Sequence, residues 1–138
     1  MKQENEELLL KDLCARLPYG VYGNYLNSDG SLSDDELLRR VKIGYHDLIC
    51  ADGRNGMVLN GFLKPYLFPL SSMTEEQIEE AKTYFWKDVD YGKNSVDKGI
   101  NCFYPCFNIL EFYHKYHIDY RGLIPKGLAV DCTNLNIY

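Results

Sequence analysis

Two cysteines and two histidines in the second half of the chain are the residues best suited to a metal site. Their spacing is Cys102-x3-Cys106-x7-His114-x2-His117, and such a set can bind zinc tetrahedrally. A helix continuing from Cys106 to His117 would hold these two residues about 16 Å apart, whereas zinc ligands lie within ~2.3 Å of the metal. A zinc site would therefore require the chain to break between Cys106 and His114. We expect no metal and no cofactor, and interpret the segment as a helix that buries His114 and ends near a cationic His117.

Three further motifs match a known site only in part. Glu111-x2-His114 is half of a di-iron signature, which needs a second copy. The stretch 88–94 resembles a calcium loop, but its glycine stands at the fifth position rather than the sixth. Gly122-x4-Gly127 has the glycine spacing of a P-loop, yet Leu128 and Ala129 replace the lysine and the hydroxyl residue. We interpret the last of these as a turn.

Nucleophilic catalysis would require a cysteine or serine beside a histidine that a third group orients. Cys50 or Cys102 with His46 or His114 provides the residue types, but none lies in a family-type signature. We therefore assign no catalytic residue. The sequence leaves enzyme activity open and favours a protein that is not an enzyme.

The glycine-rich stretch 120–127 provides the candidate binding residues Tyr120, Arg121 and Lys126. Tyrosine and arginine are favoured anchors in protein interfaces because they combine a large contact area with polar tips. Side chains in such a turn tend to be exposed. The alternative is a structural turn with Tyr120 packed inward.

Composition excludes several classes of protein. The net charge of −5 disfavours attraction to phosphate backbones, so the basic residues Arg40, Lys42 and His46 are interpreted as solvated strand charges rather than a nucleic-acid site. Apolar runs such as 8–10 are far short of a membrane span of roughly 18 residues. With no signal-like start and an odd number of cysteines, five, we expect a reduced, cytoplasmic protein without a membrane segment.

The elements that would position these residues indicate one α+β domain, 1–138. Apolar residues at helical spacing predict an opening helix over 6–17. Short β-prone pieces between turn signals over 21–70 predict a small antiparallel sheet or a partly open barrel in the first half. Alternation over 39–46 predicts a strand with Val41, Ile43 and Tyr45 on its buried face.

Two helices are expected in the second half. Thr74 and Gln77 form a capping box, with Met73 and Ile78 as a hydrophobic staple, and Gly92 can end this helix. Pro105 suits the first turn of the second helix, which would bury Phe107, Leu110, Tyr113 and His114. The stretch 122–130 predicts a turn and a short closing strand.

Three segments resemble a family of short uncharacterised proteins of gut anaerobic bacteria and of their phages and mobile elements. The segments are KDLCARLPYGV (11–21), LKPYLFPLSSMTEE (63–76) and DYRGLIPKGLA (119–129). They span both ends of the chain and keep their order. The resemblance implies a lineage but no activity, because the family brings no catalytic residue with it. The sequence departs from the family pattern in the acidic stretch 33–36 and in Cys102 and Cys106.

Two functions from different classes are consistent with these observations. The first is a non-enzymatic accessory protein of a phage or mobile element that binds a host or phage protein. The alternative is a small ligand-binding protein or enzyme, with a pocket for a nucleotide-like molecule between the sheet and the helix that starts near Pro105.

Overall fold

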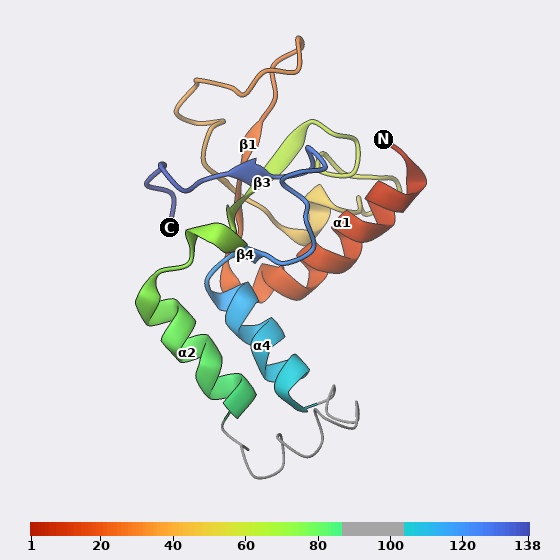
Figure 1. Ribbon diagram of the computed structural model, residues 1–138. Helices are drawn as coiled ribbons and strands as arrows, with labels where there is room; N and C mark the ends of the chain where they lie inside the picture. Colours follow the sequence, from red (N-terminus) through yellow and green to blue (C-terminus); the bar gives the residue numbers. More distant parts are fainter. Residues whose placement is uncertain (87–103) are drawn as a thin grey trace.

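The computed structural model describes residues 1–86 and 104–138, and the side chains of residues 1–84 and 109–138. Three α-helices and five strands lie within these ranges, with three short 3₁₀ turns (Figure 1). In chain order they are α1 (Gln3–Arg16), η1 (Leu17–Tyr19), β1 (Tyr22–Tyr25), β2 (Val41–Lys42), η2 (Tyr45–Asp47), β3 (Leu63–Pro69), η3 (Leu70–Ser72), α2 (Glu75–Trp86), α4 (Tyr104–Lys115), β4 (Ile118–Asp119) and β5 (Val130–Asp131). The predicted α+β class is confirmed, including the opening helix.

The strands form one mixed sheet that is not closed, with β3 at its centre. The three strands of the first half pair antiparallel, β1 with β2 and β1 with β3, as the sequence predicts. The second half adds two parallel pairs, β3 with β4 and β3 with β5. The stretch after Gly122 is therefore a turn followed by a short closing strand, as expected.

Helix α2 begins where its capping box predicts. The Gln77 N–H donates to Thr74 Oγ1 at 3.1 Å, and the Thr74 N–H donates to Gln77 Oε1 at 3.0 Å. Glu80 of α2 then accepts hydrogen bonds from Lys115 at 2.9 Å and from Tyr116 at 2.5 Å. These bonds tie α2 to the end of α4, and the two helices lie side by side below the sheet in Figure 1. The expected end of the first helix at Gly92 lies outside the described residues.

The strand expected over 39–46 is confirmed only at Val41 and Lys42 and is wrong on both sides of them. Strand β2 holds only two residues, and Tyr45, predicted to be buried, is 60% exposed. The Asp47 carboxylate accepts a hydrogen bond from the Gly44 N–H at 2.9 Å and thereby caps the η2 turn. Because this local cap forms, the alternation ends at Ile43, which is buried as predicted.

Two clusters of buried apolar side chains hold the elements together. The larger joins α1 to the sheet and to the loop after β4, with Leu13, Leu63 and Leu123 among its most buried members. The smaller lies between α2, α4 and β4 and centres on Phe112. Helix α4 thus buries Ile109 and Phe112, whereas the predicted residues Leu110 and Tyr113 are only partly buried. His114 is buried as predicted, and the Phe107 side chain lies outside the described residues.

No helix within the described ranges is long and apolar enough to cross a membrane.

Candidate functional site

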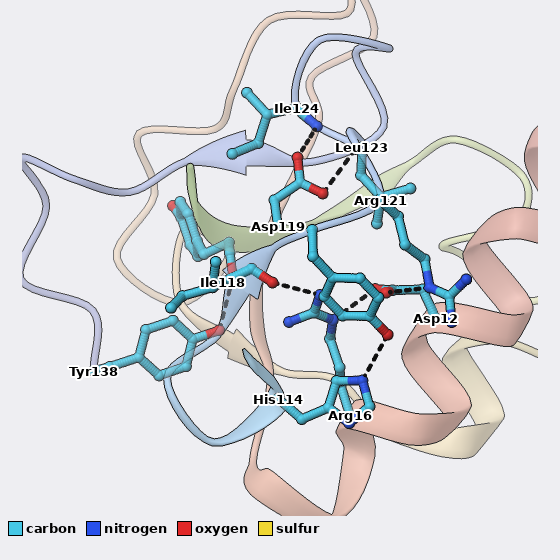
Figure 2. A network of polar contacts seen from close by, with 11 residues as sticks. Asp12, Arg16, His114, Ile118, Asp119, Arg121, Leu123, Ile124 and Tyr138 are labelled. Carbon is cyan, nitrogen blue, oxygen red and sulfur yellow. Dashed lines mark hydrogen bonds and ion pairs between the residues drawn. The ribbon is translucent and has the colours of Figure 1, made fainter. Parts of the chain in front are cut away.

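The three predicted binding residues follow β4, but the structure brings only two of them together. Tyr120 and Arg121 are partly buried, and the Arg121 guanidinium lies over the Tyr120 ring. Figure 2 shows the network of polar contacts to which Arg121 belongs. Lys126 is exposed and makes no hydrogen bond or ion pair with any described residue. Gly122 and Gly127 have φ of +74° and +72°, a conformation that favours glycine and allows the chain to turn back toward β5.

The network is built on an ion pair within α1 that the sequence analysis missed. Asp12 and Arg16 are fully buried, and Arg16 Nε donates to Asp12 Oδ2 at 2.7 Å. Arg16 Nη2 donates to the Ile118 carbonyl at 2.7 Å, and Arg121 Nε donates to Asp12 Oδ1 at 3.1 Å (Figure 2). The i,i+4 spacing of Asp12 and Arg16 is a sequence signal for a helical pair. It does not indicate that the pair is buried beneath β4.

This ion pair joins the two apolar clusters. Leu13, the neighbour of Asp12, belongs to the larger cluster, and Ile118 belongs to the smaller one. Burying charges is costly unless each is paired and hydrogen-bonded, and here one carboxylate is shared by two arginines. The arrangement fixes Arg121 and the start of the loop after β4 relative to α1.

Tyr120 packs inside this network, and its ring contacts aromatic and cationic groups. It stacks on Tyr113 at 5.2 Å between centroids, and the guanidinium carbons of Arg16 and Arg121 lie 5.2 and 4.9 Å from its centroid. Its hydroxyl lies 2.8 Å from His114 Nε2. Tyr120 is therefore a partly buried side chain rather than a fully exposed one.

Burial keeps this tyrosine and histidine uncharged at neutral pH. Desolvation raises the pKa of Tyr120, an effect that nearby Arg121 only partly offsets. Desolvation also lowers the pKa of His114, and the charge of Arg16 lowers it further. The two groups therefore form a hydrogen-bonded pair of a protonated phenol and a neutral imidazole.

Asp119 shapes the loop that carries these residues. Its carboxylate accepts hydrogen bonds from the backbone N–H groups of Leu123 and Ile124, both at 2.8 Å (Figure 2). Because Asp119 is buried and these donors satisfy it, it acts as a structural clamp on the turn rather than as a free acid.

An open groove of about 540 Å³ lies beside this loop. Its lining comes from the end of β3, from η3, and from the end of β4 with the loop after it. It is made of Pro69, Leu70, Ser71, Asp119, Tyr120, Arg121, Gly122, Ile124 and Pro125. Leu70 is 46% exposed there. Tyr120 and Arg121 therefore line a mainly apolar groove, and Lys126 directly follows the lining residue Pro125.

A second hollow, of about 290 Å³, lies between the sheet and the two helices. It is lined by Phe68, Ser72, Thr74, Gln77, Tyr116, Ile118 and Thr133. Four hydroxyl side chains and one amide therefore meet next to the end of α4. This is the region where the sequence analysis expected a pocket.

The structure tests only part of the proposed cysteine and histidine site. Cys102 and the Cys106 side chain lie outside the described residues. Within the described ranges, no group of three or more His, Cys, Asp and Glu residues is placed to hold a metal ion. The expected cationic His117 is wrong, because burial, together with the charge of Arg16, lowers its pKa to about 4.

The remaining candidates make other contacts. Cys50 Sγ donates to the Asn55 carbonyl at 3.8 Å, and His46 lies 3.4 Å from the Asp47 carboxylate. Arg40, interpreted as a solvated strand charge, is exposed but precedes β2; it donates to the Ile137 carbonyl at 2.9 Å and lies over the Tyr22 ring at 4.0 Å. None of the described cysteines is hydrogen-bonded to a histidine.

Comparison with known proteins found no matching family model, curated protein or solved structure.

Proposed function

We propose that this protein is a non-enzymatic interaction protein that binds a protein partner through the groove beside Tyr120 and Arg121. The observation that carries the proposal is that two residues chosen from the sequence line one open, mainly apolar groove of about 540 Å³. Apolar grooves on the surface of a small domain often serve as interaction sites.

The way the groove is held supports binding without rearrangement. Asp12 fixes Arg121, and Asp119 fixes the two residues that follow Gly122 along the loop. A rigid groove loses little conformational entropy when a partner docks, which favours affinity.

The groove also suggests the chemistry of the partner. Its apolar lining, with Leu70 exposed, suits an aliphatic or aromatic side chain. Arg121 lines the groove and Lys126 adjoins it, so an acidic residue next to the apolar one would complete the contact. We infer that the partner belongs to the host or to a phage, in line with the sequence resemblance, and that binding takes place in the cytoplasm.

Affinity capture with two matched variants tests the proposal. Leu70→Asp places a charge in the groove, whereas Leu37→Asp makes the same change at a leucine that is 84% exposed and does not line the groove. We expect wild type and Leu37→Asp to recover the same partner from host lysate. Leu70→Asp should recover on the order of tenfold less, as for an interface hot spot. Equal recovery by the two variants would refute the assignment of the groove.

The hollow between the sheet and the helices favours the second candidate, a small-ligand protein. Its hydroxyl and amide side chains could orient a polar ligand against the Tyr116 ring. Thermal-shift screening with nucleotides and metal ions tests this, because a ligand specific for the folded state must raise the unfolding midpoint. A nucleotide that raises the midpoint and perturbs the NMR signals of Ser72 and Thr133 would favour this candidate over the first.

A further inference from the structure

Strands β1 and β3 separate at a point where a tyrosine hydroxyl takes the place of a direct backbone bond. The described register ends at Gly23 opposite Pro65, so the next pair along the ladder would be Tyr22 and Tyr66. The Tyr138 hydroxyl lies between them. It accepts a hydrogen bond from the Tyr22 N–H at 3.2 Å and donates one to the Tyr66 carbonyl at 2.9 Å.

The Tyr138 ring packs against His117, a residue with an uncommon backbone conformation. It stacks on the His117 ring with centroids 3.5 Å apart and planes 11° apart. His117 has φ of +58° and is the only non-glycine residue with positive φ in the described parts of the chain. Its Nδ1 is buried without a hydrogen-bond partner among the described residues. Strained backbone and an unpaired buried nitrogen at one residue are features that concentrate at binding sites.

The segment that delivers Tyr138 has few other attachments. It leaves β5 at Cys132, whose N–H donates to the Leu67 carbonyl at 3.0 Å. Residues 133–136 are all exposed. Apart from the tyrosine, the outer part is held by the bond from Arg40 to the Ile137 carbonyl. The Tyr138 side chain is therefore the main anchor of this segment.

We propose that the Tyr22 N–H, the Tyr66 carbonyl and the His117 ring form a binding site for phenols, occupied here by Tyr138, that accepts a tyrosyl side chain or a small phenol from solution when this segment is displaced. The two backbone groups require a ligand atom that both accepts and donates, and a hydroxyl does both. An ammonium group cannot accept, and a phenylalanine ring can do neither. The flat His117 platform selects an aromatic ring to carry that hydroxyl. This site does not depend on the groove proposed above.

The test removes the Tyr138 side chain from the site and supplies a free phenol in its place. In Tyr138→Ala the bound phenol is replaced by added 4-methylphenol, which reproduces the tyrosine side chain without its backbone. We expect 4-methylphenol to raise the unfolding midpoint of the variant in a dose-dependent manner and to leave that of wild type nearly unchanged. Toluene has the same shape without the hydroxyl, and should bind on the order of tenfold more weakly because both backbone groups stay unpaired. Equal responses to toluene and 4-methylphenol, or equal responses of variant and wild type, would overturn the proposal.

A second variant covers the case in which Tyr138→Ala does not fold. Tyr138→Phe keeps the ring on His117 and removes only the hydroxyl. Hydrogen exchange of the Tyr22 amide should then accelerate by on the order of tenfold, because its acceptor is gone. The Phe68 amide, which donates to the His117 carbonyl at 2.9 Å, provides the control and should exchange at its wild-type rate. An unchanged Tyr22 rate would show that the hydroxyl does not bridge the strands.

Discussion

Asp12 is a fully buried carboxylate that accepts hydrogen bonds from both Arg16 and Arg121. Removing it leaves a fully buried arginine without its counter-ion, so Asp12→Ala should destabilise the fold by about 3–5 kcal/mol in urea unfolding. Adding Arg16→Met removes the orphaned charge and should restore part of the loss, because an apolar side chain of similar length can fill the space. A double variant less stable than Asp12→Ala would mean that Arg16 packs favourably even without its partner.

The other prediction at this scale concerns the His117 imidazole. Its pKa is about 4 in the fold and ordinarily 6.5, so the unfolded chain binds the proton first as pH falls. The contribution of neutral His117 is complete above pH 6.5 and is lost progressively between pH 6.5 and 4. The full shift corresponds to a decrease on the order of 3 kcal/mol in the free energy of unfolding. His117→Asn, which tolerates positive φ, should reduce this slope in urea titrations at pH 7, 6 and 5. If the free energy of unfolding of His117→Asn depended on pH as steeply as that of wild type, other groups would be responsible for the dependence.

Among the elements, α2 offers the clearest test, because its start depends on two reciprocal hydrogen bonds between Thr74 and Gln77. Thr74→Ala should cost about 1 kcal/mol in unfolding free energy through loss of the cap. Thr83→Ala, on the exposed face of the same helix, makes the same chemical change and should cost little or nothing. Similar losses in the two variants would show that the cap does not determine the start of the helix.

Local signals also explain which elements the sequence could predict. The capping box and the turn after Gly122 depend on residues a few positions apart, so both could be predicted from the sequence. The end of β2 at Lys42 could not be predicted, because the hydrogen bond from the Gly44 N–H to Asp47 forms a turn where the alternation predicts a strand. The buried face of α4 was placed about one residue off, because α2 and β4 determine which side of that helix is covered.

At the scale of the whole molecule, the sequence could not predict contacts that join distant segments. The bond from Arg16 to the Ile118 carbonyl spans 102 positions, and the parallel pairing of β3 with β4 and β5 has no local signature. Tyr120 and Arg121 were found from residue type and turn composition, whereas the groove that they line depends on η3 approaching the loop after β4. Two residues that line the groove could thus be chosen from the sequence, but its other lining residues, its shape and the buried Asp12–Arg16 pair could not.

The same arrangement predicts how a partner should respond to salt. If Arg121 and Lys126 contribute through charge, the partner's association rate should decrease as ionic strength rises, while its dissociation rate changes less. Stopped-flow or surface-based kinetics at two salt concentrations would measure both rates. A salt-independent association rate would assign binding to the apolar lining alone.

Photo-crosslinking in the cell tests most directly whether this groove is where the protein meets a partner. A photoreactive phenylalanine analogue replaces Pro125, which lines the groove, or Leu37, which does not. We predict a discrete higher-mass adduct from position 125 after irradiation and none from position 37. Adducts of equal yield from both positions, or an adduct from position 37 alone, would contradict the assignment of the groove as the binding surface.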